Sequence, residues 1–257
     1  MPLSASRKPR SRHRLDHRPA PSVGCSVPKK EAWEKVTGAA LYVDDLSVPG
    51  VLHGRTVRST LPHARILSVT LDPTFDWSGF TVVDHRDIPG ENVVALIEDD
   101  QPALAADLVR HAEEPILLLA HEDPERAEEG VRHVRVDVEP LAAALTVQEA
   151  LALKVRLYGE DNVFKRFHVE RGDVEAALAR ADVVVEGEYR VPHQEQLYIE
   201  NNGMVAHFEP DGTLVVRGSL QCPFYVHKAL KRVFALPDDK VRVIQTVTGG
   251  GFGGKEE

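Results

Sequence analysis

The sequence has 257 residues, with 40 acidic and 31 basic side chains, a formal net charge of −9 and two cysteines. This length suffices for one or two domains, and 42% apolar with 28% charged residues is typical of a soluble globular protein. No run approaches the ~18 apolar residues of a membrane-spanning helix. Two cysteines exclude a disulfide framework and a four-cysteine iron–sulfur cluster. We therefore expect a cytoplasmic protein with no membrane contact.

The charge is unevenly distributed along the chain. Residues 1–30 carry eight basic side chains and one acidic side chain, whereas the remainder carries 23 basic and 39 acidic side chains. The first segment has few large apolar residues and cannot bury enough surface to offset its ordering entropy, so we predict a disordered basic tail. The acidic remainder would repel phosphates, which argues against a nucleic-acid partner.

Residues 31–145 alternate in the manner of half-buried strands, with one helix among them. Period-two patterns predict strands over 50–60, 64–72 and 134–140, and a continuous apolar run predicts a strand buried on both faces over 115–120. Asp123 followed by Pro124 predicts the start of a helix. We expect an α+β domain here.

A second unit is expected over 168–257, after a linker at 146–167 that contains a short helix starting behind Thr146. The patterns predict a helix at 174–181, capped by Asp173, and a strand at 182–191. They then predict a hairpin at 203–219 that turns at Pro210–Gly212, a helix at 224–235 and a last strand at 240–247. The last strand runs into a glycine-rich loop. Because strand edges and loops need partners, we expect this domain to be incomplete.

Five of the six residues from 249 to 254 are glycine. Such a run suits positive φ angles, or a close approach of a ligand to the backbone, and successive amides can bind an anion. The alternative to a ligand-binding loop is a flexible tail that binds no ligand. The dinucleotide fingerprint G-x-G-x-x-G is matched formally by Gly249, Gly251 and Gly254, but the acid expected ~20 residues later is absent. A phosphate-binding P-loop would need Ser or Thr after Lys255, and Glu256 stands there instead. We therefore reject both motifs.

These residues carry a resemblance to a known family. "TVTGGGFGGKE" (246–256) resembles the glycine-phenylalanine loop of the molybdenum subunit in the xanthine dehydrogenase/aldehyde oxidase family. Residues 34–66 resemble the opening of its α/β hammerhead domain, 168–206 the start of its first cofactor domain, and "SLQCPFYVHKAL" (219–230) a segment beside the metal. The resemblance implies a hammerhead-type domain followed by an incomplete α+β molybdopterin-binding domain.

The resemblance also assigns roles to single residues. Gln221 matches a glutamine that lies beside the molybdenum without binding it directly, and that hydrogen-bonds an oxo or dithiolene group of the cofactor. The family also has a loop whose backbone lies against the molybdenum centre, and the residues that match it are Gly250, Gly251, Phe252 and Gly253. Glu256 stands where xanthine dehydrogenases have a purine-binding glutamate, so the closest similarity is to that branch. No catalytic residue is assigned, because the family's base lies beyond this segment.

The resemblance implies an enzyme that oxidises purine-like heterocycles such as xanthine and hypoxanthine, with water as the oxygen source. Its cofactor would be molybdenum-molybdopterin, with a cytosine dinucleotide form left open. The 2Fe-2S clusters and FAD are expected on partner domains or subunits, beside the rest of the molybdenum subunit. The isolated chain is expected to be inactive. An aldehyde oxidase or other molybdenum hydroxylase subunit, and a non-catalytic remnant or assembly module, are the alternatives.

Other polar residues suggest no further site. The twelve histidines show no zinc-binding spacing. Glu195 and Glu200 are expected to be structural, either solvated or ion-paired. Cys222, next to Gln221, is expected to be a small buried residue rather than a metal-binding thiolate.

Overall fold

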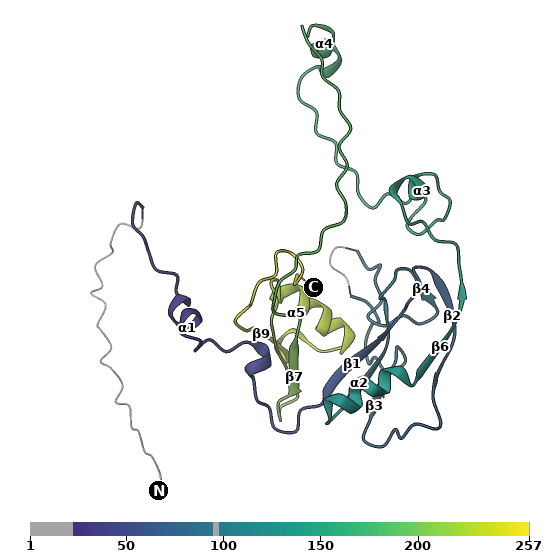
Figure 1. Ribbon diagram of the computed structural model, residues 1–257, viewed down its shortest axis with the longest axis vertical. Coiled ribbons are helices and arrows are strands. Elements are labelled where there is room, and N and C mark those ends of the chain that lie inside the picture. The colour runs from purple at the N-terminus through teal and green to yellow at the C-terminus, as the bar shows by residue number, and fades with distance from the viewer. Residues whose placement is uncertain (1–22, 95–97, 257) are drawn as a thin grey trace. The chain divides into compact units, whose positions relative to one another are not determined.

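A computed structural model describes residues 23–94 and 98–256 of the chain (Figure 1). The chain divides into residues 1–40 and residues 41–257. The described part of the first unit contains the helix α1 (Ala32–Val36), none of whose residues is buried. Most of the predicted basic tail lies outside the described residues. None of the helices in the described ranges is long and apolar enough to cross a membrane.

The first half of the larger unit contains two antiparallel sheets and a helix. One sheet has the order β1 (His53–Arg58), β5 (Pro115–His121), β3 (Thr81–Val83), and the other β4 (Leu108–Val109), β2 (Ala64–Leu71), β6 (Val134–Pro140). Helix α2 (Pro124–Arg132) packs against β1 and β5 (Figure 1). The 3-10 helix η1 (Val43–Asp45) precedes the first strand. The strands predicted around 50–60, 64–72, 115–120 and 134–140 are thus confirmed.

Local signals in this half behave as expected, with one exception. The Asp123 side chain accepts a hydrogen bond from the amide of Glu125 at 2.8 Å and caps α2. In β5, Leu117 and Leu119 are buried in a core cluster with Val57. Leu118, on the other face, is 39% exposed, so the prediction that both faces are buried was wrong at this position.

The second half contains a mixed sheet and a crossover helix. The order is β7 (Met204–Phe208), β8 (Leu214–Gly218), β9 (Val241–Gln245), with β7 antiparallel and β9 parallel to β8. Helix α5 (Pro223–Val233) and the 3-10 helix η2 (Asp238–Lys240) connect the parallel pair. The predicted hairpin is confirmed, and Gly212 has a φ of 82° in its turn. The crossover is the usual connection between parallel strands.

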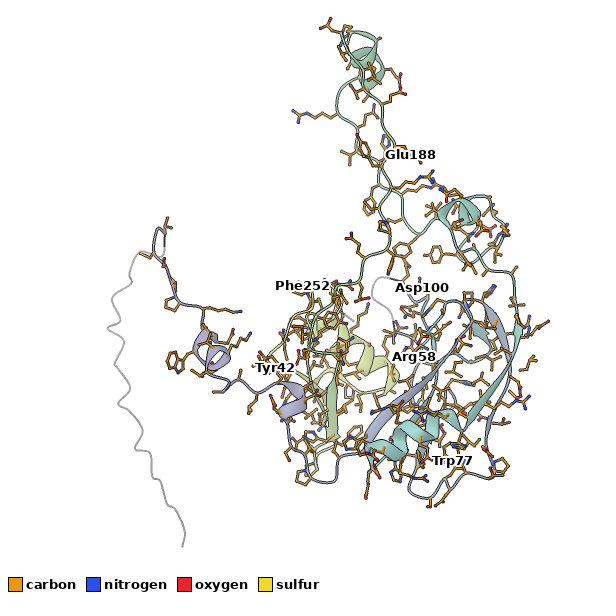
Figure 2. All side chains as sticks on the ribbon, in the orientation of Figure 1. Tyr42, Arg58, Trp77, Asp100, Glu188 and Phe252 are labelled. Carbon is orange, nitrogen blue, oxygen red and sulfur yellow. The ribbon has the colours of Figure 1, made fainter. Side chains whose placement is uncertain are left out.

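Residues 141–203 contain two short helices and no strand. These are α3 (Val147–Leu151), capped by Thr146, and α4 (Val174–Ala179), capped by Asp173. The strand predicted at 182–191 was wrong: this segment has no ladder, and Val185 and Tyr189 are 86% and 91% exposed. Glu188, labelled in Figure 2, lies in the same segment. Alternating side chains favour a strand only where a neighbouring strand provides hydrogen bonds, and none does so among the described residues.

The C-terminal end of α5 is covered by the loop after β3. The amides of Gly90 and Glu91 donate to the carbonyls of Val233 and Arg232, both at 2.9 Å. These bonds satisfy carbonyl groups that a helix end otherwise leaves without partners. Arg232 also forms ion pairs with Glu91 and Asp99. The loop therefore links the region of the first two sheets to the sheet of β7, β8 and β9.

This junction predicts a strong effect of a small substitution. A Cβ atom on Gly90 would lie 2.0 Å from the carbonyl oxygen of Arg232, which is backbone and cannot move aside cheaply. We expect Gly90→Ala to lower the free energy of unfolding by about 2 kcal/mol. Gly54→Ala is the matched control, because its Cβ would meet no atom within 4 Å. Denaturant melts of both variants test this, and equal stabilities would contradict the packing described here.

Candidate functional site

The parallel pairing of β8 and β9 places two loops at one edge of the sheet. The carboxyl end of β8 leads into Ser219–Cys222, and that of β9 leads into Thr246–Lys255. In sheets of this kind, ligands bind in the space outside the carboxyl ends of the parallel strands. The end of β9 is joined to the first of these loops, because the Gln245 side chain donates to the carbonyl of Leu220 at 2.7 Å. The candidate site is therefore built where two segments distant in sequence meet.

Gln221 is held by the glycine-rich loop through three hydrogen bonds. Its side-chain oxygen Oε1 accepts hydrogen bonds from the backbone amides of Gly253 at 3.0 Å and Lys255 at 3.3 Å. The backbone amide of Gln221 donates to the carbonyl of Lys255 at 2.6 Å. With its oxygen occupied, the side chain offers Nε2 as a donor. Within the described residues this nitrogen makes no hydrogen bond. Gln221 thus presents a fixed donor group.

The loop itself ends in a tight turn. The amide of Gly254 donates to the carbonyl of Gly251 at 2.8 Å, and Phe252 and Gly253 between them have φ angles of 51° and 93°. Positive φ at both central positions is the pattern of a type I′ turn. Phe252, labelled in Figure 2, is 76% exposed, while Gly251 is buried. A non-glycine residue at positive φ stores strain of about 1–3 kcal/mol, which the surrounding contacts must hold.

Most of the glycines are required by close packing against side chains. A Cβ on Gly251 would lie 2.3 Å from Gln221 Oε1, one on Gly249 would lie 2.6 Å from Glu200 Cβ, and one on Gly254 would lie 2.5 Å from the Tyr198 ring. Gly250 instead needs its φ of 100°. The glycine run alone predicts positive φ angles or a close approach of a ligand. The structure adds a third cause, the contact with Glu200, Gln221 and Tyr198.

An ion pair between the buried Lys255 and the largely buried Glu200 lies beneath the loop. Lys255 is 1% exposed, and its Nζ is 2.9 Å from both Glu200 Oε2 and Ser219 Oγ. The ammonium group also lies over the Tyr198 ring, 4.7 Å from its centroid. Glu200 Oε2 accepts further bonds from Ser219 Oγ at 2.6 Å and the amide of Gly249 at 2.5 Å. Of the two states expected for Glu200, solvated or ion-paired, the structure shows the ion pair, and the sequence did not indicate its partner.

Opposing effects act on the pKa of Glu200. Burial raises this pKa, and hydrogen bonds from Ser219, Gly249 and Lys255 lower it by more, so that it lies below its ordinary value. A carboxyl with a lowered folded pKa contributes stability above its unfolded pKa of about 4.3, and that contribution is lost as the pH falls through the folded value.

We therefore expect the stability difference between the wild-type chain and Glu200→Gln to depend on pH. The wild type should be more stable near pH 7, and the difference should shrink as the pH falls below the unfolded pKa of about 4.3, because Glu200 is then protonated in the unfolded chain before it is protonated in the folded one. Denaturant melts of both proteins at pH 7, 5 and 3.5 measure it. A difference that stays constant across this range would show that the charge of Glu200 contributes no stability.

The remaining sequence-predicted residues lie around this loop. Glu256 follows the buried Lys255 and is itself exposed. Cys222 is half-buried rather than buried, and it stands at the N-cap of α5 without a side-chain hydrogen bond to the helix. The start of α5 therefore lacks a capping side chain, and its first residue, Pro223, has no N–H group. Glu195 hydrogen-bonds only to the adjacent amide of Gln196 among the described residues.

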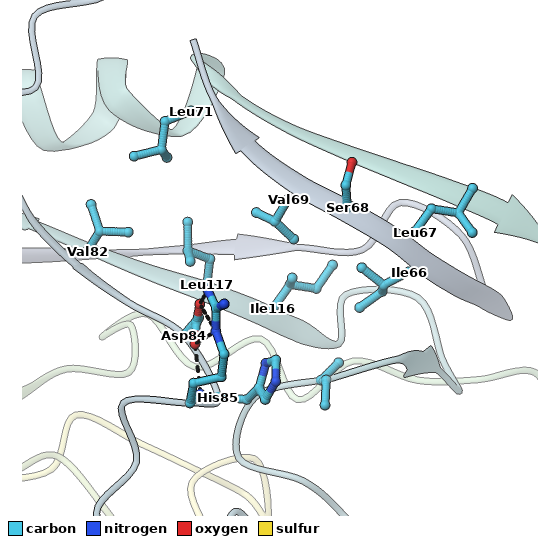
Figure 3. A pocket seen from close by; sticks show the side chains of 13 residues that line it. Ile66, Leu67, Ser68, Val69, Leu71, Val82, Asp84, His85, Ile116 and Leu117 are labelled. Carbon is cyan, nitrogen blue, oxygen red and sulfur yellow. Dashed lines mark hydrogen bonds and ion pairs between the residues drawn. The ribbon is translucent and has the colours of Figure 1, made fainter. Parts of the chain in front are cut away.

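Two other features of the described residues carry no assignment. No group of three histidine, cysteine, aspartate or glutamate residues able to hold a metal ion occurs in the described ranges. A cavity of about 510 Å³ lies between β2 and β5, lined mostly by apolar side chains such as Val69 and Leu117 (Figure 3). Its Asp84 is bonded to Arg86, and this hydrogen bond lowers the pKa of Asp84. None of the cofactor-binding or substrate-binding residues predicted from the sequence lines this cavity.

Comparison with known proteins gives two family matches. Residues 37–142 match the "Aldehyde oxidase and xanthine dehydrogenase, a/b hammerhead domain". Residues 157–257 match the "Molybdopterin cofactor-binding domain". The second match contains the whole candidate site.

Individual relatives agree with these matches. The chain is 36% identical to the nicotinate dehydrogenase large molybdopterin subunit of Eubacterium barkeri, covering 91% of this chain and 55% of the relative. It is also 36% identical to a probable xanthine dehydrogenase subunit of Bacillus subtilis, covering 87% and 30%. The aldehyde oxidoreductase structure from Desulfovibrio gigas superposes with a TM-score of 0.80 at 27% identity, covering 88% of this chain and 27% of that one. The chain thus spans about half or less of the length of these relatives.

Proposed function

The chain belongs to the aldehyde oxidase and xanthine dehydrogenase family as part of a molybdenum-binding subunit, and on this premise we propose that Gln221 and the glycine-rich loop bind a molybdenum–pterin cofactor for the oxidation of a purine-like heterocycle. The observation that carries the proposal is the fixed Gln221 amide. Its Oε1 is bound by Gly253 and Lys255, so Nε2 is offered as a donor at the carboxyl ends of β8 and β9.

The residues present fit such a group. An oxo or dithiolene group is a hydrogen-bond acceptor, and the available donor of Gln221 complements it. The start of α5, next to Gln221, has no capping side chain, and the positive end of the helix dipole there favours the negative charge of a phosphorylated pterin. The exposed turn at Phe252 and Gly253 leaves backbone accessible beside the same side chain. The proposal includes both the plain pterin and its cytosine dinucleotide form.

The residues of this chain would bind the cofactor and orient the heterocycle. When bound, the cofactor supplies the redox chemistry that places an oxygen atom from water on an electron-poor ring carbon. Gln221 would hold the cofactor through Nε2 and hold the loop through Oε1. Glu256, exposed beside the loop, would accept a hydrogen bond from a ring N–H and so orient the heterocycle. No proton-transfer base is assigned to this chain.

Glu256 is the reason for favouring a purine-like substrate. The printed names of the relatives include nicotinate and xanthine dehydrogenases as well as an aldehyde oxidoreductase. A carboxylate can pair with the N–H groups of a purine, whereas a simple aldehyde offers no such donor. For electron transfer we propose partner domains or subunits with 2Fe-2S clusters and FAD, because the two cysteines of this sequence are too few for a cluster.

The test is turnover of the assembled enzyme in water labelled with oxygen-18. We expect xanthine or hypoxanthine to gain one labelled oxygen atom per turnover, with molybdenum and pterin present in equal amounts. Product without the label, or a purified enzyme without molybdenum, would contradict the proposal. Labelled product from aldehydes but not from purines would instead favour an aldehyde oxidase.

A further inference from the structure

Glu200 connects the two ends of the glycine-rich loop through a single oxygen atom. Its Oε2 is 2.5 Å from the amide nitrogen of Gly249, where the loop begins, and 2.9 Å from Nζ of Lys255, where the loop ends. Ser219, at the carboxyl end of β8, donates to the same oxygen at 2.6 Å. One carboxylate thus binds both ends of the loop to the neighbouring strand.

Lys255 directs its ammonium group into the interior rather than toward the surface of the loop. Two of its N–H groups are directed to Glu200 Oε2 and Ser219 Oγ, and the ammonium lies over the ring of Tyr198. It is 1% exposed. The ammonium group is therefore committed to contacts within the chain in this arrangement. The backbone of the same residue, however, bonds Gln221 twice, through its amide at 3.3 Å and its carbonyl at 2.6 Å.

Stability alone gives a poor reason for this pair. Burying two charges costs solvation energy, and a buried ion pair is often no more stable than apolar residues of similar size. Glu200 carries an additional cost, because its other oxygen, Oε1, is buried without a hydrogen-bond partner among the described residues. What apolar residues would not reproduce is the fixed geometry of the contacts with Gly249 and Lys255.

We propose that Glu200 and Lys255 form a positioning pair, which holds both ends of the loop so that Gln221 presents its amide nitrogen to the cofactor. This inference rests on the proposed cofactor site. The contacts run in sequence from Glu200 to the side chain of Lys255, and from the backbone of Lys255 to Gln221. Removing the pair releases the loop and with it the orientation of Gln221.

The test compares Glu200→Gln, Lys255→Met and the double variant, with Glu195→Gln as the matched control. Each single variant leaves a buried polar group without its partner and should lower the melting temperature. The double variant removes both charges and should recover most of that loss. Hydrogen exchange of the 249–255 amides in the full chain should nevertheless be about tenfold faster in the double variant, with β2 and β6 unchanged.

A second readout is the molybdenum content of the assembled enzyme. We expect the double variant to contain less than half the molybdenum of the wild type, and Glu195→Gln to match the wild type. Wild-type loop exchange or wild-type molybdenum content in the double variant would overturn the positioning role. If the wild-type enzyme itself lacks molybdenum, the proposed function fails, while the exchange measurement still decides whether the pair holds the loop.

Discussion

Replacing Gln221 with glutamate is expected to lower the molybdenum content or the turnover of the assembled enzyme by about 10- to 100-fold, the range found when a group that supports a metal ligand is changed. Glutamate retains an oxygen that can accept the hydrogen bonds of Gly253 and Lys255. It replaces the Nε2 donor with a second acceptor, which would repel an oxo or dithiolene group. The substitution therefore tests the donor while keeping the loop in place.

Gln221→Leu serves as the comparison, because it removes the donor and the acceptor together. For this variant we expect faster hydrogen exchange at Gly253 and Lys255 in addition to the loss of molybdenum. For the glutamate variant we expect exchange at these amides to stay at the wild-type rate. Full molybdenum content and full turnover in the glutamate variant would show that Nε2 makes no contact with the cofactor.

Replacing Glu256 with alanine is expected to change substrate preference rather than cofactor binding. A site that pairs with a substrate N–H group discriminates strongly, and we expect kcat/KM for xanthine to fall about 100-fold or more. Turnover of an aromatic aldehyde should change by less than about threefold, because it offers no N–H group. Steady-state kinetics with both substrates measure the two effects, and molybdenum content serves as the control for cofactor loading.

Two results would contradict the role of Glu256. An equal fall for xanthine and the aldehyde would place the effect on the loop and the adjacent Lys255 rather than on substrate. An unchanged kcat/KM for xanthine would remove the reason for preferring a purine. Glu256→Gln refines the test, because an amide retains an acceptor oxygen and should retain part of the xanthine activity.

Local patterns were sufficient to predict most helices and strands. The caps at Asp123, Thr146 and Asp173 act on amides two or three residues away, so their signals can be read from neighbouring residues. The strand predicted at 182–191 failed because a strand depends on a partner that a local pattern cannot supply. The parallel pairing of β8 with β9 was not predicted either, since strand order is set by contacts between distant segments.

The candidate site was predicted in part, and only with the help of resemblance. The glycine run is visible in the sequence, and the family motifs led to Gln221, the loop and Glu256. Glu200, Ser219 and Tyr198 were not predicted to contact Lys255, because they lie 36 to 57 residues before it and join it only in the fold. The glycine run itself gave no sign that Lys255 would be buried, and a buried lysine is what requires a carboxylate partner.

Differential hydrogen exchange of the assembled enzyme, with and without its molybdenum–pterin cofactor, tests the central claim most directly. Enzyme from molybdenum-depleted cells provides the cofactor-free form. If Gln221 and the glycine-rich loop bind the cofactor, loading should slow exchange at Gly250–Gly253 and at the first amides of α5, and leave β2 and β6 unchanged. Equal exchange at these positions in the two forms, with protection elsewhere, would contradict the assignment of this site.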